Sequence, residues 1–483
     1  MKSTELSKGE KVSRKQAARL NLLLMTDSYK FTHWRQYPPK TERVYSYVES
    51  RGGMFKETVF FGLQYYLKHY LEGPVFVPED IDEAEEFCRA HFGHPSYFNR
   101  EGWLELLDRW GGRLPLEIKA VPEGTVVPVS NVMLTVENTD PRFPWLTNYL
   151  ETLLLKVWYP ITVATLSREI KKVFLFHLER SGDPALVPFK LHDFGYRGVS
   201  SEETAALGAA AHLVNFQGTD TVAGIQLLRT YYGTHAMPAF SVPAAEHSTV
   251  TAWGRAHERD AYQNMLSEFP DGIVACVSDS YDVFNACEHI WGEQLRDQIL
   301  ARNGVLVIRP DSGDPKTVVL KVLEILGEKF GFVVNSKGYK VLNPKVRIIQ
   351  GDGVNYWTIQ DVLTTMSRAG WSADNISFGM GGALLQQLNR DTQKFAFKCS
   401  NVTVAGEDRS VFKAPVTDEG KAQKRGRLAL VRRDGHLETV HTAKGVGKAG
   451  NLLETVFLNG DIKRQFTLEE IRQNAEVLRK VKS

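Results

Sequence analysis

Seven short apolar segments between residues 190 and 384 each stop abruptly at acidic, histidine, arginine or glycine residues, and this recurrence most constrains the fold. In chain order they are LHDFGYRG (191–198), QGTDTVAG (217–224), SVPAAEHS (241–248), VACVSDSYD (274–282), VLVIRPDSGDP (305–315), RIIQGDGV (347–354) and ISFGMGGAL (376–384). Amphipathic stretches of helical length fill most of the intervals. Such alternation is typical of parallel strands connected by helices, and strands that close into a barrel carry the active site at their carboxyl ends. An α/β enzyme is therefore the leading prediction.

The rest of the chain has a mixed pattern that predicts a second domain. VYSYVESR (44–51) alternates as a strand does, LPLEIKAVPEGTVVPVS (114–130) predicts a β-meander, and FAFKCSNVTV (395–404) predicts another strand. The turn-rich SGDPALVP (181–188) marks a boundary. We expect a flexible N-terminal tail (1–16), a flanking α/β domain built from both chain ends (17–180 with 391–483), and an α/β barrel that carries the active-site loops (181–390).

Capping patterns predict where several helices begin and end. Ser200 with Glu203, and Thr467 with Glu470, have the spacing of a capping box, in which each side chain bonds the other residue's backbone N–H. HIWGEQLRDQILARNG (289–304) is amphipathic and ends in Asn-Gly, which predicts a helix that stops there.

Composition excludes several classes of protein. The chain has 483 residues, 43% of them hydrophobic and 24% charged, which is typical of a globular protein. A net charge of +2 gives no reason to expect nucleic acid or a membrane as partner. The polar N-terminus lacks a signal-peptide pattern and the most apolar stretch (153–166) is too short to cross a bilayer, so a cytoplasmic location is expected. Four cysteines without a CxxC pair predict reduced thiols.

Glycines end the last two apolar segments of the series. Gly351 and Asp352 follow the first of them, and Gly381 and Gly382 follow the second. Glycine lets backbone N–H groups approach an anion, and barrel enzymes commonly bind phosphate after their final two strands. The pair of motifs therefore favours a phosphate site. Ordinary tight turns are the alternative for either motif taken alone.

Two further segment ends carry charged residues suited to catalysis. Arg309 and Asp311 are two residues apart, so on an extended chain they point the same way and can share one ligand. An internal ion pair that fixes the loop is the alternative. His247 lies between Glu246 and Ser248, where it can act as a general base or as a nucleophile towards phosphate. A hydrogen-bonded structural histidine is the alternative there.

An aromatic residue and a carboxylate end the first two segments. Phe194 precedes Arg197 in HDFGYRG, and Asp220 lies in TDTVAG. A flat heterocycle that bears an amide needs an aromatic ring for stacking and an acceptor for its N–H. Core packing of Phe194 and a turn role for Asp220 are the alternatives. Further on, nine basic residues between Arg390 and Arg427 form either a solvated face or a polyphosphate site.

These motifs together resemble one known family. TDSYKFTHWRQYPP (26–39), LHDFGYRGVSSEETA (191–205), GTDTVAG (218–224), SVPAAEHS (241–248), VSDSYD (277–282), RPDSG (309–313), QGDGV (350–354) and FGMGG (378–382) look like the nicotinamide phosphoribosyltransferase family, from about Asn21 to the C-terminal helix. The resemblance implies a pentosyltransferase with an irregular α/β barrel of the type II phosphoribosyltransferase kind and a second α/β domain. It also implies a head-to-tail homodimer with active sites at the interface.

The resemblance assigns roles to individual residues. It implies that Phe194 and the other subunit's copy of Tyr29 stack on the nicotinamide ring, that Asp220 accepts from the carboxamide, and that His247, beside Glu246 and Asp279, is phosphorylated. The residues implied to contact the amide, ribose and 5′-phosphate are Arg309, Asp311, Arg197, Gly351, Asp352, Gly381 and Gly382. Those implied to hold pyrophosphate or ATP are Arg51, Arg390, Lys398, Lys413 and Lys421.

The resemblance also implies a reaction and its partners. Nicotinamide and 5-phosphoribosyl 1-pyrophosphate would give nicotinamide mononucleotide in NAD salvage, with ATP as co-substrate and Mg²⁺ held mainly by pyrophosphate and water. Met380, Ala383 and Ala396 depart from the family pattern and bear on the fine phosphate contacts. A nicotinate phosphoribosyltransferase of the same fold is the closest alternative. A catalytically silent phosphosugar or nucleotide sensor, and an unrelated barrel enzyme acting on sugar phosphates, are the others.

Overall fold

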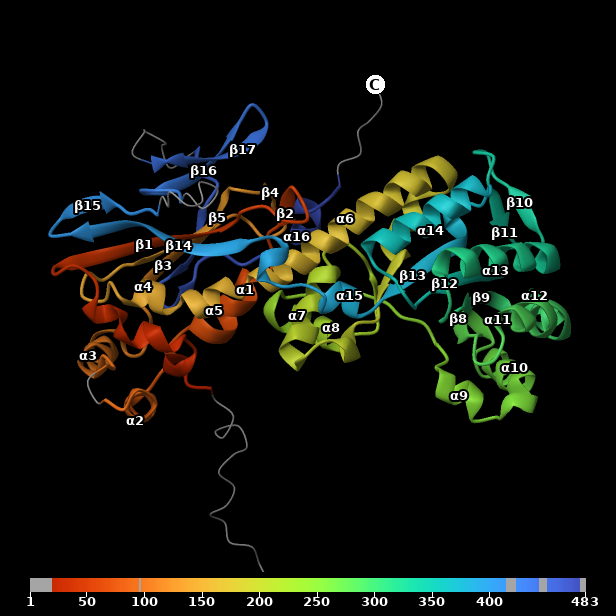
Figure 1. Ribbon diagram of the computed structural model, residues 1–483, viewed down its shortest axis with the longest axis horizontal. Coiled ribbons are helices and arrows are strands. Elements are labelled where there is room, and N and C mark those ends of the chain that lie inside the picture. Colours follow the sequence, from red (N-terminus) through yellow and green to blue (C-terminus); the bar gives the residue numbers. More distant parts are fainter. Residues whose placement is uncertain (1–19, 95–96, 414–422, 443–449, 478–483) are drawn as a thin grey trace, which may run out of the picture.

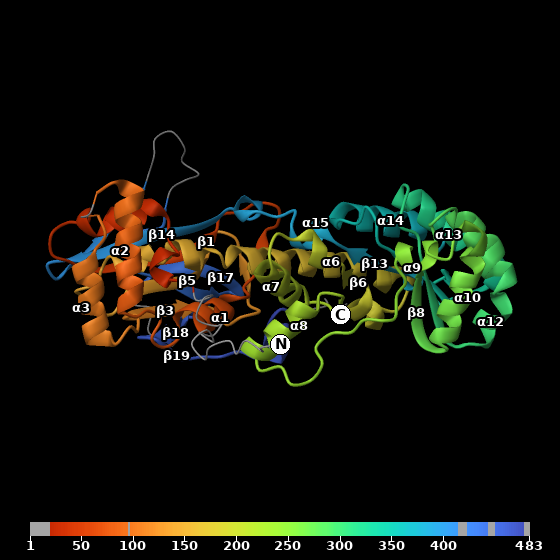
Figure 2. The same cartoon turned by 90° about the horizontal axis from the view of Figure 1, so that it is seen from below.

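The computed structural model describes residues 20–94, 97–413, 423–442 and 450–477. Figures 1 and 2 show an elongated molecule with an antiparallel sheet towards one end and a parallel sheet towards the other. The predicted tail (1–16) and Lys421 lie outside the described residues. The predicted domain limits at 181 and 390 stay predictions.

The larger sheet has seven strands that come from both ends of the chain. Its order is β15-β14-β1-β5-β3-β18-β19 and its pairs are antiparallel. Strand β1 pairs with β14 from Thr41↔Val404 to Ser50↔Phe395, so this pairing joins segments that are distant in the sequence. The strands are β1 (Thr41–Ser50), β3 (Leu116–Ala120), β5 (Val132–Asn138), β14 (Phe395–Val404), β15 (Glu407–Ser410), β18 (Glu454–Leu458) and β19 (Asp461–Ile462).

Helices and small hairpins surround this sheet. Pro78 opens α2 at a position where a missing N–H costs nothing, and Gly93 closes it in a left-handed conformation with φ 66°. The other elements are the 3₁₀-helices Leu22–Leu24 and Ser28–Arg35, the π-helix Leu67–Leu71, helices α1 (Leu63–Tyr66), α2 (Pro78–Phe92), α3 (Arg100–Trp110), α4 (Leu146–Tyr149), α5 (Glu151–Leu155) and α16 (Leu468–Asn474), and strands β2 (Glu57–Val59), β4 (Val126–Pro128), β16 (Leu428–Arg433) and β17 (His436–His441).

The second sheet is parallel and curled, in the order β7-β6-β13-β12-β9-β8. Among the strands of this sheet, β6 comes first along the chain and β13 comes last, and the two are neighbours, as the closure of a barrel requires. Its strands are β6 (Leu191–Asp193), β7 (Gly218–Thr219), β8 (Asp271–Val277), β9 (Asn303–Arg309), β12 (Val346–Gln350) and β13 (Ile376–Met380). The predicted α/β barrel is confirmed.

One of the seven predicted strands was wrong in detail. Residues 240–245 form no regular strand, but make isolated parallel bridges from Phe240 to Gly218 and from Ala244 to Ala275. The segment thus spans the gap between edge strands β7 and β8. Pro243, which has no N–H to donate, interrupts a regular ladder there.

Helices connect the parallel strands, and one predicted helix was wrong in detail. Residues 289–304 are divided between a π-helix (Ala286–Gln294), α12 and the start of β9. The Asn-Gly pair instead opens β9, where Gly304 pairs with Gly272 and a Cβ on Gly304 would lie 1.9 Å from the Gly272 carbonyl oxygen. The helices and the hairpin here are α7 (Glu202–His212), α8 (Val222–Tyr231), α9 (His247–Thr251), α10 (Glu258–Glu268), α11 (Val283–Asn285), α12 (Arg296–Ala301), α13 (Pro315–Phe330), α14 (Tyr356–Arg368), α15 (Gly382–Leu385), β10 (Phe332–Val334) and β11 (Lys340–Leu342).

The long helix α6 (Trp158–Ser181) joins the two halves (Figure 1). Its Thr165 hydroxyl accepts from Val59 N in β2 (2.9 Å), and its Phe174 ring lies 5.7 Å from that of Phe378 in β13. The Tyr159 hydroxyl donates to Leu385 O in α15 (2.8 Å). The helix therefore fixes the parallel sheet relative to the flanking domain. Among the described helices, none has the length and apolar character needed to cross a membrane.

Candidate active site

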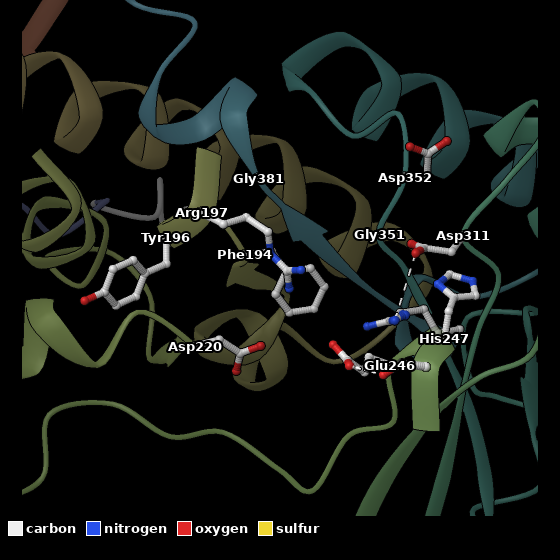
Figure 3. A pocket seen from close by; sticks show the side chains of 12 residues that line it. Phe194, Tyr196, Arg197, Asp220, Glu246, His247, Asp311, Gly351, Asp352 and Gly381 are labelled. Carbon is white, nitrogen blue, oxygen red and sulfur yellow. Dashed lines mark hydrogen bonds and ion pairs between the residues drawn. The ribbon is translucent and has the colours of Figure 1, made fainter. Parts of the chain in front are cut away.

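The carboxyl ends of the parallel strands surround a cavity of about 650 Å³. Ten of the predicted site residues line it, from the loops after five strands and from the segment that bridges β7 and β8. Figure 3 shows the side chains that converge there. The cavity is lined by Phe194, Tyr196, Arg197, Asp220, Glu246, His247, Ser248, Arg309, Asp311, Gly351, Asp352 and Gly381.

The Phe194 ring is half-buried and lines the cavity, so it is not simply a core residue. Its backbone N–H donates to Met380 O in β13 (3.0 Å). The ring lies directly against the β13 backbone, since a Cβ on Gly379 would be only 1.9 Å from it. Any side chain at Gly379 would displace the ring. The cavity thus contains an aromatic surface whose position a glycine permits.

Asp220 contributes an oriented carboxylate to the cavity. Its Oδ1 accepts hydrogen bonds from His192 Nε2 (2.9 Å) and Ser241 Oγ (2.6 Å). Burial opposes ionisation of Asp220, but the hydrogen bonds from His192 and Ser241 outweigh it and hold the pKa of this carboxyl below its ordinary value. Asp220 is therefore an ionised acceptor, suited to a ligand N–H.

Arg309 and Asp311 form a loose pair, with 3.9 Å between Arg309 Nη2 and Asp311 Oδ2. Arg309 Nε is buried, and among the described residues it has no hydrogen-bond partner. Burial raises the pKa of Asp311 against the opposing charge of Arg309, and the nearby carboxylates of Asp279 and Asp352 raise it further. A tight internal ion pair would satisfy both groups. This geometry instead leaves hydrogen-bonding capacity for a polar ligand.

His247 is the first residue of α9, and its ring is held by a neighbouring strand end. Its Nε2 lies 3.0 Å from Asp279 Oδ1, and Asp279 Oδ2 accepts from Ser312 Oγ (2.5 Å). The His247 side chain is 47% exposed, whereas Asp279 is 6% exposed. A buried carboxylate thus orients an accessible imidazole. Beside it, Glu246 accepts a short hydrogen bond from Ser248.

The glycine turns bring neighbouring loops close to each other. A Cβ on Gly351 would lie 2.8 Å from Asp311 Oδ1, and one on Gly198 would lie 3.3 Å from the Cα of Gly382. Gly382 begins α15 next to cavity-lining Gly381, but does not itself line the cavity. The Met380 side chain is buried in the core. Its departure from the family pattern therefore does not place a side chain in the cavity.

The remaining predicted site residues lie elsewhere on the same chain. Tyr29 is 57% exposed and lines a separate cavity of about 420 Å³. Arg51, Arg390 and Lys398 line a third cavity of about 530 Å³, together with Ala396. Lys398 also lines the Tyr29 cavity, so these two cavities adjoin. They lie in the half of the molecule that contains the antiparallel sheet.

Lys413 is the last described residue after β15, and its backbone pairs with that of Gln423. The structure gives it no place in either of these cavities.

Sequence reasoning missed several residues that the structure places at these sites. His192 and Ser241 orient Asp220, and Ser312 orients Asp279. Lys394 adds a cation to the cavity lined by Arg51, Arg390 and Lys398, called the basic cavity below. Each of the first three lies inside one of the seven segments described above. The sequence gives no sign of their pairing, because each bond joins two different segments of the cavity rim. Tyr196, Ser248 and Glu151 also line the cavities.

The fold is shared with a solved structure. Nicotinate-nucleotide pyrophosphorylase from Pyrococcus furiosus has a TM-score of 0.59 to this chain at 17% identity, and the match covers 97% of each chain. This match shows the fold alone, an α/β barrel of the type II phosphoribosyltransferase kind beside a second α/β domain.

Sequence comparisons define the family. Residues 189–467 match the nicotinate phosphoribosyltransferase (NAPRTase) family, and residues 21–118 match the N-terminal domain of nicotinamide phosphoribosyltransferase. The chain is 53% identical over 470 residues to the nicotinamide phosphoribosyltransferase of Xanthomonas campestris pv. campestris, covering 95% of this chain and 99% of that one. Identity to the Acinetobacter baylyi protein of that name is 34%, with 94% and 97% covered. The chain therefore belongs to the nicotinamide phosphoribosyltransferase family.

Proposed function

We propose that the protein transfers the phosphoribosyl group of 5-phosphoribosyl 1-pyrophosphate to nicotinamide. The products are nicotinamide mononucleotide and pyrophosphate, and the reaction is a step in NAD salvage. One observation carries the proposal: a single cavity unites an aromatic ring, an ionised acceptor, glycine turns, and an arginine whose Nε has no partner among the described residues. These are the groups that a pyridine amide and a phosphorylated ribose need.

The base is held by Phe194 and Asp220. The ring of Phe194 stacks on the pyridine, and the Asp220 carboxylate accepts from the carboxamide N–H. Because His192 and Ser241 both donate to Oδ1 of Asp220, Oδ2 is the oxygen available to the base. The negative charge disfavours nicotinate, whose carboxylate would meet a like charge without an N–H to offset it.

The sugar is held by the loops after β9, β12 and β13. Asp311 accepts from ribose hydroxyls, Arg309 Nε donates to an oxygen of the ligand, and the turns at Gly351 and Gly381 face the 5′-phosphate with Arg197. Departure of pyrophosphate gives the anomeric carbon oxocarbenium character. Pyridine nitrogen is a weak nucleophile, so holding it beside that carbon is the main source of rate, worth several kcal/mol.

ATP hydrolysis is coupled through His247. With a proton on Nε2 donated to Asp279, the lone pair of Nδ1 is free to attack the γ-phosphorus of ATP. The bond from the γ-phosphorus to its bridging oxygen breaks, ADP leaves, and water later releases phosphate from the histidine. Asp279 stabilises the positive charge that the phosphorylated ring carries. The phosphohistidine makes binding tighter and the yield of nicotinamide mononucleotide more favourable.

A homodimer completes the site. Within one chain, Tyr29 and the basic cavity lie apart from the cavity that contains Phe194. A head-to-tail partner brings Tyr29 to the second face of the base and brings Arg51, Arg390 and Lys398 to the pyrophosphate or ATP. Mg²⁺, bound mainly by pyrophosphate and water, would neutralise charge on the leaving group beside Asp311 and Asp352. The side chains of Arg51, Arg390 and Lys398 stabilise the negative charge on pyrophosphate directly.

Product analysis tests the proposal. Purified protein is incubated with 5-phosphoribosyl 1-pyrophosphate, Mg²⁺ and either nicotinamide or nicotinate, with and without ATP, and the nucleotides are separated by chromatography. Nicotinamide mononucleotide and pyrophosphate in equal amounts, with more product when ATP is present, support it. Efficient use of nicotinate alone would identify the alternative, a nicotinate phosphoribosyltransferase of the same fold.

A further inference from the structure

A buried carboxylate, Asp193, lies behind the two side chains proposed to hold the base. Asp193 is the last residue of β6, and it is 0% exposed. Its Oδ1 accepts from Gly195 N (2.7 Å), and its Oδ2 accepts from Thr219 Oγ1 (2.9 Å). Thr219 is the residue of β7 that pairs with Asp193 in the sheet. One carboxylate therefore joins the ends of two adjacent strands.

These bonds fix the backbone on both sides of Phe194. Asp193 belongs to β6, and the N–H of Gly195 is tied back to the Asp193 carboxylate, so Phe194 lies inside a closed turn. The Phe194 N–H is itself bonded to β13 through Met380 O (3.0 Å). The orientation of the ring is thus set by the turn that Asp193 closes.

Asp193 also contacts the turn that contains Asp220, through its backbone carbonyl and through its carboxylate. Asp220 N donates to Asp193 O (3.0 Å). Thr219 Oγ1, which donates to Asp193, also accepts from Thr221 N (2.9 Å). The Thr219 hydroxyl is therefore shared between the Asp193 carboxylate and the turn that contains Asp220.

We infer that Asp193, acting through the Thr219 hydroxyl, is a positioning residue that sets the separation between the Phe194 ring and the Asp220 carboxylate. The inference rests on the proposed function, because it concerns how the base is held. A pyridine with a carboxyl-derived group is small and rigid, so its stacking contact and its hydrogen bond must be made at one fixed spacing. Asp193 is enclosed behind both contacts and does not touch the base.

The test removes the Thr219 hydroxyl without changing the shape of the side chain. Thr219→Val leaves two buried polar groups, Asp193 Oδ2 and Thr221 N, without this partner. Thr221→Val is the matched control: its side chain is also buried, two residues away, and its hydroxyl has no hydrogen-bond partner among the described residues. Thr219→Ser restores the hydroxyl, and Thr219→Ala removes it again with less bulk.

Steady-state kinetics and thermal unfolding are measured for each variant with the base that the wild-type protein uses. Thr219→Val and Thr219→Ala are expected to raise KM for the base by roughly tenfold, which corresponds to one lost buried hydrogen bond. KM for 5-phosphoribosyl 1-pyrophosphate should stay within about twofold of wild type. Thr219→Ser should recover most of the loss, and Thr221→Val should behave as wild type.

Other outcomes overturn the inference. A lower melting temperature with an unchanged KM for the base would show that the hydroxyl only stabilises the fold. An equal rise in KM for base and sugar, or the same change in Thr221→Val, would show that the bond is not specific to the base contacts. A wild-type protein that uses neither nicotinamide nor nicotinate would instead refute the proposed function, and the inference with it.

Discussion

Replacing Asp220 by asparagine changes one atom of the site in a way that tests base selection. The retained Oδ1 of Asp220→Asn can still accept from His192 and Ser241, which fixes the amide so that its NH₂ replaces Oδ2. The group that faces the base then changes from a charged acceptor to a neutral donor. Nicotinamide loses its acceptor, whereas nicotinate loses a repulsive charge and gains a donor.

The size of the expected change in base preference depends on how far the Asp220 carboxylate is exposed to solvent. Two unit charges about 4 Å apart interact by about 4 kcal/mol at an effective dielectric constant of about 20, and by about 1 kcal/mol in water. The Asp220 side chain is 47% exposed, so its environment lies between these limits. We expect a change of about 2 kcal/mol in the preference for nicotinamide over nicotinate, which is roughly thirtyfold in the ratio of kcat/KM values.

The assay measures kcat/KM for both bases at saturating 5-phosphoribosyl 1-pyrophosphate. Ser241→Ala is the control, because it removes one donor to Oδ1 and keeps the charge of Asp220. It should weaken both bases by a similar factor and leave the ratio near that of wild type. An equal loss for both bases in Asp220→Asn would refute the argument that this carboxylate discriminates between them.

Three more perturbations follow from the structure. His247→Ala should abolish stimulation by ATP and nicotinamide-dependent ATP hydrolysis while the circular dichroism spectrum stays unchanged; persisting ATP stimulation would exclude the histidine from coupling. Mixing inactive Tyr29→Ala with inactive Phe194→Ala should restore about a quarter of wild-type activity, since half of the random dimers regain one intact site; no recovery would contradict a shared site. Burial raises the pKa of Glu123 to about 7, so the stabilising effect of its neutral form is complete below about pH 4.5 and is lost as pH rises through 7. Chemical denaturation should show the unfolding free energy falling by about 3 kcal/mol across that window, and Glu123→Gln should remove most of this slope; an unchanged slope would show that Glu123 is not its source.

Much of the parallel sheet could be predicted because most residues of its strands are buried or half-buried. Such strands need an unbroken apolar run, and the run ends where the strand meets solvent at the rim. Six of the seven predicted segments form strands. Residues 240–245 differ because Pro243 interrupts the ladder, and only isolated bridges remain. The apolar run was correctly recognised, but its pairing was decided by the neighbouring strands.

The two predicted capping boxes show where local rules hold and where packing overrides them. Thr467 and Glu470 cap α16 as predicted, because Glu470 makes the capping bond with Oε2 while its Oε1 accepts from Arg464 (3.1 Å). At α7, the prediction was wrong by one residue, because Ser201 is the cap. Glu203 instead accepts from the hydroxyls of Tyr65 (3.0 Å) and Tyr70 (2.6 Å), which come from the flanking domain.

The sequence by itself determined which residues meet at the cavity. Parallel strands joined by helices all end at the same rim, so residues such as Phe194, Asp220, His247 and Arg309 are brought together by connectivity alone. Only the tertiary structure decided how they are held, through Asp193, Asp279 and the helices that pack behind them. Those bonds join separate strand ends at distances set by the curvature of the sheet, and no local periodicity in the chain specifies that curvature.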